Sequence, residues 1–179
     1  MAVSTLLAVA VGIVAGLLAG GSLRNLGEVR LRWWLLLPLG VALERVVTAR
    51  GVPAPFAGVV LAQLYLVAFA AANVRVRGMI VVLIGLALNT VAIVANHGMA
   101  VRVRAARLAN VHVAHTATHH LATAHSRLMA LADIIPVHRL HVVLSFGDLI
   151  VAVAVADVLF GLMRATRTAV APNVVPVAV

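Results

Sequence analysis

Cysteine and lysine are both absent from this chain of 179 residues, and each absence excludes a class of site. Without cysteine the chain can form no disulfide, no cysteine-ligated iron–sulfur cluster and no zinc–thiolate site. Without lysine, all fourteen positive charges are arginines, and against five carboxylates they give a formal net charge of +9. The arginines are spread in short clusters rather than gathered in one basic stretch, so we expect no nucleic-acid partner.

Charge of either sign is also scarce. Charged residues make up 11% of the chain, against about 25% in a soluble globular domain. Hydrophobic residues make up 64%, which is more apolar surface than a soluble fold of this length can bury. The composition therefore predicts an integral membrane protein with the lipid bilayer as a partner.

Five long apolar stretches occupy most of the sequence. A membrane-spanning helix needs about 20 predominantly apolar residues to cross a hydrocarbon core of about 30 Å. We therefore predict an all-α polytopic membrane helix bundle with five transmembrane helices, at residues 4–20, 33–49, 55–73, 79–96 and 142–163. They form one membrane domain, residues 1–163, followed by a proline-interrupted C-terminal tail, residues 164–179. No basic residue precedes the first stretch, so we interpret it as a retained span and not as a secretory signal.

Most arginines lie at the ends of these stretches, where their side chains can reach lipid headgroups. The tightest clusters are Arg24, Arg30 and Arg32 in the first loop and Arg75 with Arg77 in the third. The positive-inside rule places these two loops in the cytoplasm. We therefore expect a multi-pass protein with its N-terminus outside the cell and its C-terminus in the cytoplasm.

The fourth and fifth stretches are separated by an insertion, residues 97–140, that holds seven of the eight histidines. Its middle, residues 104–133, lacks glycine and proline and is rich in alanine and leucine, which predicts a helix. At 100° per residue His112, His115 and His119 fall on one face of that helix. We therefore expect an amphipathic helix that lies in the membrane interface or caps the bundle.

The histidine face has three interpretations. Because histidines at i and i+4 can share a metal ion, His112, His115 and His119 are candidate zinc ligands, with a further ligand from another element. Because histidine titrates near neutrality, the face is also a candidate pH-responsive patch. We favour a solvated polar face. A haem held by His97 and His141 is a further alternative, but no cofactor is predicted.

Polar residues inside the apolar stretches are functional candidates, since burying them in a membrane is costly. Asp148 and Asp157 are nine residues apart, which places them on opposite faces of one helix. For Asp148 we favour interhelical hydrogen bonding over an ion pathway that it would share with Asn89 and Gln63. Glu44, near the end of the second stretch, is interpreted as reaching the headgroups.

Three glycines in the first stretch, Gly12, Gly16 and Gly20, are spaced four residues apart. This repeats the spacing of the GxxxG motif, in which small residues let two helices approach closely. We expect this face to pack tightly against another helix.

Three segments together resemble a known family: residues 89–99 (NTVAIVANHGM), 131–136 (LADIIP) and 145–148 (SFGD). They are similar to the uncharacterised bacterial membrane proteins grouped as domain-of-unknown-function 5317. Where the family reads Asn-Gly-Gly-Met-Pro, this chain has Asn-His-Gly-Met-Ala at residues 96–100. The resemblance implies a polytopic protein of the bacterial cytoplasmic membrane with no known activity. It also implies one polar constellation of Asn89, Asn96, Asp133 and Asp148.

No complete catalytic, nucleotide-binding or cofactor-attachment motif is present in the sequence. We therefore expect a non-enzymatic accessory or structural subunit of a larger membrane complex, for example a respiratory or other energy-transducing one, with other membrane subunits as partners. A small ion- or proton-coupled transporter that uses Asp148 is the first alternative. A histidine-dependent metal or haem membrane protein is the second.

Overall fold

The computed structural model describes residues 2–48, 56–113 and 118–164, and these are mostly helical. Five apolar helices account for the bulk of the fold: α1 (Ala2–Leu18), α3 (Leu36–Thr48), α4 (Phe56–Ala72), α5 (Met79–Asn96) and α7 (Phe146–Arg164). Each overlaps one of the predicted apolar stretches, because these segments are rich in alanine and leucine and contain few helix-breaking residues. The predicted tail, apart from Arg164, lies outside the described residues.

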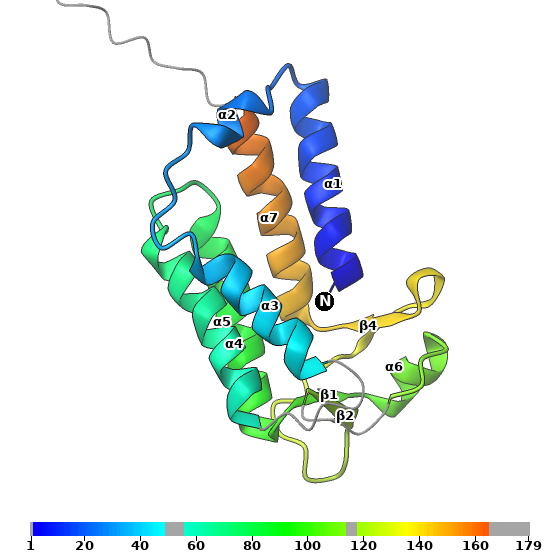
Figure 1. The fold of residues 1–179 in the computed structure, drawn as a ribbon. Coiled ribbons are helices and arrows are strands. Elements are labelled where there is room, and N and C mark those ends of the chain that lie inside the picture. Colours follow the sequence, from blue (N-terminus) through cyan, green and yellow to red (C-terminus); the bar gives the residue numbers. More distant parts are fainter. Residues whose placement is uncertain (1, 49–55, 114–117, 165–179) are drawn as a thin grey trace, which may run out of the picture.

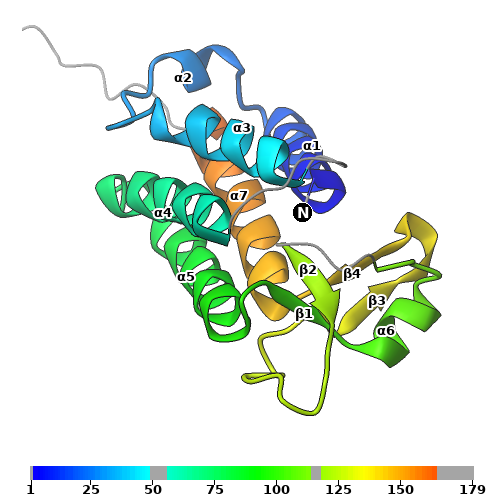
Figure 2. The same cartoon turned by 60° about the horizontal axis from the view of Figure 1, so that its bottom comes forward.

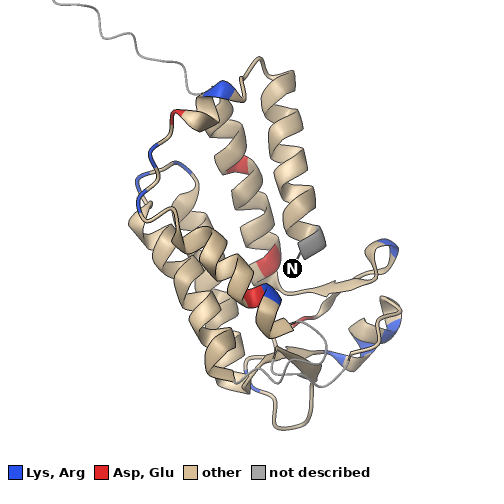
Figure 3. Cartoon of the chain, viewed as in Figure 1, with Lys and Arg blue, Asp and Glu red and all other residues tan. Residues whose placement is uncertain are grey.

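The five helices run side by side in an order that differs from their order in the sequence. Helix α7 packs between α1 and α5, and α4 packs between α5 and α3. Figure 2, which looks more nearly along the helices, shows the four short strands gathered beyond one end of this bundle. The arginines lie mainly at the two ends of the helices and in the loops there, as Figure 3 shows.

Two of the helices, Met79–Asn96 and Phe146–Arg164, are long and apolar enough to cross a membrane, while α1 and α4 are apolar but shorter. In the apolar windows of these two helices only 39% and 28% of the residues are buried. The core helix of a soluble protein would be mostly buried. The predicted count of five transmembrane helices is not supported by length, because α3 has thirteen residues and spans about 20 Å.

The second apolar stretch begins its helix later than predicted. Residues 32–35 form turns, Trp33 has a φ of 51°, and the helix starts at Leu36. The segment before it includes the short helix α2 (Arg24–Gly27) and is tied to the end of α4 by Asn73. The Asn73 side chain accepts a hydrogen bond from the Arg32 amide and donates one to the Arg32 carbonyl, at 2.8 and 2.9 Å.

The predicted amphipathic helix over residues 104–133 is wrong for the described part of that segment. The chain forms only a short helix there, α6 (Val103–Leu108), and the rest is strands, turns and irregular structure. Strand β1 (Met99–Val101) pairs in parallel with β2 (His119–Leu121), and β3 (Ile135–Val137) pairs in antiparallel fashion with β4 (Val142–Leu144) across a 3₁₀ turn, His138–Leu140. The fold is therefore not all-α.

Local conformation explains why the helix stops at Leu108. Asn110 adopts a left-handed φ of 53°, and the Val111 amide donates back to the Ala106 carbonyl at 3.0 Å. This is the pattern by which many helices end. The residues that follow are mainly histidine and β-branched, which lowers helix propensity and favours strands. Hydrogen bonding to β1 then stabilises the extended conformation of residues 119–121.

The fifth apolar stretch also begins its helix later than predicted. Val142 and Val143 belong to β4 and pair with β3, and α7 begins at Phe146. Valine is favoured in strands because its branched side chain packs well on a pleated surface. This shift leaves Ser145 and Asp148 at the first turn of α7, next to the strands.

The close-packing glycines are only partly those predicted. A Cβ on Gly12 would lie 2.7 Å from the Ala156 carbonyl oxygen, and one on Gly16 would lie 2.7 Å from the Met163 sulfur, so both glycines face α7. Gly20 instead occupies a left-handed turn with a φ of 78°, and its Cβ would meet nothing. Gly21 is the third contact residue, because its Cβ would lie 2.8 Å from the Met163 carbonyl oxygen.

Candidate functional site

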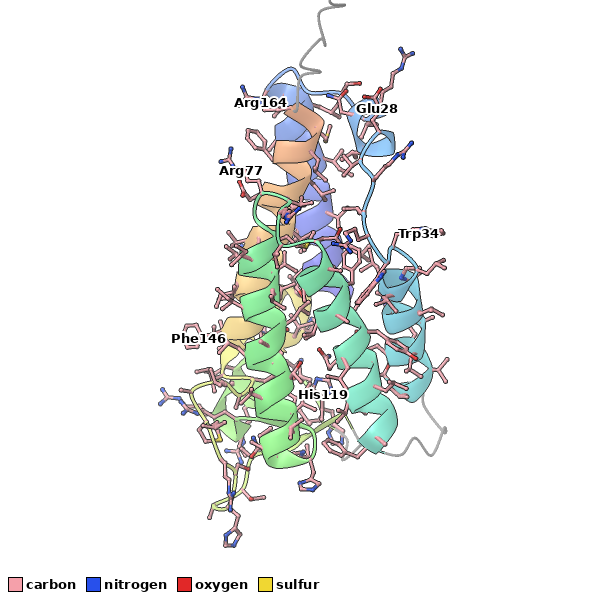
Figure 4. The ribbon with its side chains drawn as sticks, turned by 90° about the vertical axis from the view of Figure 1, so that its left-hand side faces the viewer. Glu28, Trp34, Arg77, His119, Phe146 and Arg164 are labelled. Atoms are coloured by element: carbon pink, nitrogen blue, oxygen red, sulfur yellow. The ribbon has the colours of Figure 1, made fainter. Side chains whose placement is uncertain are left out.

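A small polar cavity of about 30 Å³ lies at the strand end of the bundle. Three of the five carboxyl residues of the chain line it, together with polar side chains from α3, α4 and β2. The full lining is Glu44, Thr48, Val59, Gln63, Ile93, Met99, Thr118, His119, Asp133, Val143 and Asp148. This volume accommodates about two water molecules. Figure 4 shows His119 toward this end of the bundle, away from Glu28 and Arg164.

Asp148 is fixed in the cavity wall by a closed set of hydrogen bonds. Its Oδ1 accepts from the Asn89 amide group at 2.9 Å, and its Oδ2 accepts from the Ser145 backbone N–H at 3.1 Å. The Ser145 hydroxyl accepts from the Asp148 N–H at 3.0 Å and donates to Asn89 Oδ1 at 2.9 Å. All three side chains are buried.

The reciprocal bonds between Ser145 and Asp148 form a capping box at the start of α7. In this motif a serine and an acidic residue three positions later satisfy each other's backbone N–H groups. The sequence carries the signal for this cap, Ser-Phe-Gly-Asp before an apolar run, but the predicted constellation did not include Ser145, so this site residue was missed. The cap fixes the Asp148 carboxylate relative to α5.

Glycine allows α5 and α7 to approach closely at this point. A Cβ on Gly147 would overlap Asn89 Oδ1, and one on Gly85 would lie 3.0 Å from the Gly147 carbonyl oxygen. No larger residue fits at position 147 unless Asn89 moves away. The bond between Asn89 and Asp148 therefore depends on this glycine.

Asp133 reaches the cavity from the loop before β3. Its backbone is held against β1, since its N–H donates to the Ala100 carbonyl and its carbonyl accepts from the Arg102 N–H, both at 2.9 Å. Its side chain is 5% exposed, and Oδ2 lies 3.7 Å from His119 Nε2. Oδ1 is buried without a hydrogen-bond partner. Burial, together with the negative charge of Asp148, raises the pKa of Asp133 to about 8.

Gln63 and Glu44 complete the polar lining from α4 and α3. Gln63 is 2% exposed, and its Oε1 is a second buried oxygen without a hydrogen-bond partner. Glu44 is partly buried and lines the cavity, so the prediction that it reaches the headgroups does not describe its position. Leaving a buried polar atom unpaired costs about 1–3 kcal/mol. The cavity thus presents two buried oxygen atoms without a hydrogen-bond partner.

The structure brings together three of the four residues of the predicted constellation. Asn89 and Asp148 are hydrogen-bonded, and Asp133 lines the same cavity as Asp148. Asn96 is the last residue of α5 and does not line the cavity. Its side chain donates a hydrogen bond to the Arg127 carbonyl at 2.9 Å and accepts one from the Arg127 N–H at 2.7 Å. It anchors the loop of the insertion to α5.

The predicted helical face is not formed by His112 and His119, the two of its three histidines that the structure describes. His112 lies in irregular structure, His115 falls outside the described residues, and His119 is in β2. His97 and His141 hold left-handed positions after α5 and after the 3₁₀ turn, with their rings against Phe56 and His138 respectively. Within the described ranges no three histidine, aspartate or glutamate residues are placed to hold a metal ion.

Comparison with known proteins gives a family and no activity. The profile of a family of unknown function, DUF5317, matches residues 28–160, well over half of the chain. The match includes every residue that lines the cavity and leaves out all of α1, all of α2 and the last residues of α7. No curated protein and no solved structure matches the chain. The expected family is thereby confirmed: the chain belongs to DUF5317.

Proposed function

We propose that this chain is an integral protein of the bacterial cytoplasmic membrane that carries a proton or another small cation through its carboxyl-lined cavity. Large apolar side chains are exposed along the outer faces of α1, α3, α4 and α5. A continuous apolar outer surface of this kind is stable in lipid and not in water. Arginines at both ends of the helices suit the two headgroup regions (Figure 3). All five apolar helices would then lie in the membrane, with the N-terminus outside.

One observation carries the ion-binding part of the proposal. Gln63 Oε1 and Asp133 Oδ1 are both buried without a partner, and both residues line the cavity that Asp148 also lines. Oxygen atoms in that state favour a proton, a hydrated cation or water donors between them. Ionisable groups buried inside a membrane bundle are typical of ion and proton pathways.

The position of the cavity favours a carrier over an open pore. On the side away from the strands, a cluster of buried apolar residues fills the space between α4, α5 and α7: Leu66, Phe69, Ala70, Met79, Val82, Leu86, Ala154 and Val158. Among the described residues, this apolar cluster lies between the cavity and the other end of the bundle. A carrier reaches its site from one face at a time, which fits a cavity at one end of the bundle.

The test is ion flux in proteoliposomes that contain the purified full chain. A pH-sensitive dye inside the vesicles reports proton movement when a potassium gradient with valinomycin sets a membrane potential, and added sodium tests for exchange. We expect flux above that of empty vesicles, and Asp148→Asn should reduce it at least tenfold. Asp157→Asn is the matched control, since Asp157 lies on the same helix but does not line the cavity.

Two outcomes would contradict the proposal. The first is flux through the unaltered chain that equals the leak of empty vesicles for both protons and sodium. The second is equal loss of flux in Asp148→Asn and Asp157→Asn, which would indicate a general disturbance of α7. Circular dichroism of each variant checks that the helices are intact.

The accessory-subunit function is a second proposal, and the outer face of α1 favours it. Helix α1 packs on α7 through Gly12 and Gly16, so its opposite side presents exposed apolar residues, among them Val11 and Val14. A partner helix could cover this side. Co-purification of a partner at fixed stoichiometry, lost when Val11 and Val14 are both replaced by tryptophan, would support this proposal. Purification of the chain alone under mild detergent would contradict it.

A further inference from the structure

His119 lines the cavity and also reaches water. Its side chain is 44% exposed, whereas that of its neighbour Asp133 is 5% exposed. The two residues come from different elements, β2 and the loop before β3, and β1 holds both of them in place. A titratable ring therefore stands between bulk water and a buried carboxyl group.

We infer that the ion is a proton, and that His119 and Asp133 form the route by which it passes between water and the cavity. This inference rests on the proposed function and specifies its ion and its entry path. It is carried by the contact of 3.7 Å between His119 Nε2 and Asp133 Oδ2 and by the difference in exposure of the two side chains.

The transfer needs no reactant besides water. One ring nitrogen of His119 takes a proton from a hydronium ion, and the other ring nitrogen releases a proton to the Asp133 carboxylate. A small rotation of the ring brings Nε2 from 3.7 Å to hydrogen-bond distance of Oδ2, about 2.9 Å. Asp133 then holds the proton at the wall of the cavity. Each step breaks one bond to hydrogen and forms another.

The two aspartates differ in their hydrogen-bond partners. Asp148 accepts two N–H hydrogen bonds, whereas Asp133 Oδ1 has no donor. Burial and the charge of Asp148 raise the pKa of Asp133 to about 8, so Asp133 holds the shared proton near neutral pH. Paired carboxyl groups in contrasting environments are typical of proton-transfer sites.

The imidazole is suited to pass the proton on. Protein atoms packed around the ring lower the pKa of His119 below its usual range, although water still reaches the exposed part of the ring. A histidine that releases its proton readily does not trap it. The other titratable groups facing this pair are Asp148 from α7 and Glu44 from α3, and His120 is the neighbour on β2 itself.

The size and chemistry of the cavity favour a proton over a metal ion. Its volume of about 30 Å³ holds about two water molecules. In the described part of the chain no three carboxyl or imidazole groups converge with the spacing of metal ligands. A proton needs only one carboxyl oxygen and a chain of hydrogen bonds.

The experiment follows protonation of Asp133 directly, without any transported substrate. Purified full-length chain in detergent is shifted rapidly from pH 9 to pH 6.5, and time-resolved infrared spectroscopy follows the band of the protonated carboxyl group. Asp133→Asn assigns the band by removing it. We expect His119→Ala to slow the appearance of the band at least tenfold, with the final amplitude retained. Imidazole added to the buffer should restore the rate, because a small diffusing base can replace the missing ring.

His120→Ala is the matched control. His120 is the next residue of β2, and successive side chains of a strand face opposite sides. The His120 side chain lines a separate surface hollow, together with Asn96 and His125. Its loss should leave the rate unchanged. If His119→Ala fails to fold, His119→Gln serves instead. Equal rates in the unaltered chain and in a folded His119 variant would overturn the inference.

The outcomes separate this inference from the proposed function. Flux through the unaltered chain that persists undiminished in His119→Ala would overturn the route while the carrier proposal stands. A slowed and imidazole-rescued band in a chain that carries no flux would support the route and overturn the carrier. A missing carboxyl band in the unaltered chain would overturn the route.

Discussion

The two ends of α7 are held in place by opposite kinds of interaction. At its start, buried polar groups of Ser145 and Asp148 bond to each other and to Asn89 of α5. Toward its end, Ala156 and Met163 lie against Gly12 and Gly16 of α1, and the one side-chain hydrogen bond recorded there among the described residues comes from Asn25 to the Met163 carbonyl. One helix thus joins a polar, hydrogen-bonded contact to an apolar, closely packed one.

The difference shows which end stabilises the fold and which end does chemistry. Close apolar contact gives dispersion energy without the cost of desolvating polar groups. A buried polar network is stabilising only while every member has a partner, and this one borders unpaired oxygens of Gln63 and Asp133. We infer that the α1 end anchors α7 and that the strand end carries the function.

The largest loss of stability should come from a steric clash between α1 and α7, at the anchored end of α7. Gly12→Leu places a side chain where even a Cβ lies 2.7 Å from the Ala156 carbonyl oxygen, and backbone cannot move aside cheaply. We expect a loss of about 3 kcal/mol in the free energy of unfolding, measured by denaturant titration in mixed micelles. Gly16→Ala should cost less, since the nearest atom is the flexible end of Met163. Gly27→Ala, which meets nothing, is the control, and a loss there equal to that of Gly12→Leu would refute the anchoring role.

The second effect concerns the polar end. Asn89→Leu removes the donor to Asp148 and the acceptor for the Ser145 hydroxyl, which leaves two buried polar groups unpaired. We expect a loss of about 2 kcal/mol, together with loss of proton flux. Thr90→Val is the matched control on the same helix, because the Thr90 hydroxyl bonds only to the Leu86 carbonyl. Equal destabilisation by both changes would mean that the network contributes nothing specific.

The third effect is a dependence of the free energy of unfolding on pH, which we expect from the polar end alone. The folded chain keeps the Asp133 proton up to a pKa of about 8, whereas the unfolded chain releases it at 3.8. Between these values the folded state binds more protons, so this contribution is greatest at low pH and is lost as pH rises through 8. The pKa of His119 is lowered in the folded chain, so its contribution to stability rises with pH instead of falling. This rise is complete by pH 6.5, the usual pKa of histidine.

Between pH 6.5 and pH 8, Asp133 therefore changes its contribution to stability, whereas His119 does not. The free energy of unfolding should fall across it by at most about 2 kcal/mol, the effect of one proton over that range. Asp133→Asn should abolish this fall, and Gly16→Ala, at the anchored end, should leave it unchanged. A fall of the same size in Asp133→Asn would assign the dependence to another group.

Sequence reasoning predicted the apolar helices and part of the site, and the reasons are local. Asn89 and Asp148 stand out because a polar residue in an apolar run needs a partner, and the structure pairs them. The helix over residues 104–133 failed because absence of glycine and proline permits a helix but does not compel one. There Asn110 and Leu128 both take left-handed conformations, and β1 offers β2 a partner.

The cavity itself could not be predicted, because it depends on contacts between distant elements. Nothing local places Glu44 of α3 and Gln63 of α4 beside Asp133 of the insertion. Gly20 shows the limit of a spacing rule, since it shares the four-residue spacing but serves a turn with a φ of 78°. Spacing identifies a face, whereas the partner of that face is set by the whole fold.

Replacement of Asn96 should have the smallest effect on stability. It tests whether an asparagine side chain outside the cavity has a structural role only. Asn96 is seven residues after Asn89 on the same helix, yet it bonds to the Arg127 backbone near the surface. Asn96→Ala should cost about 1 kcal/mol and speed hydrogen exchange of the Arg127 amide. It should leave the fall between pH 6.5 and pH 8 intact, since no atom of Asn96 lines the cavity. A changed pH dependence in Asn96→Ala would show that the loop anchored by Asn96, in addition to the pairing with β1, holds Asp133 in place.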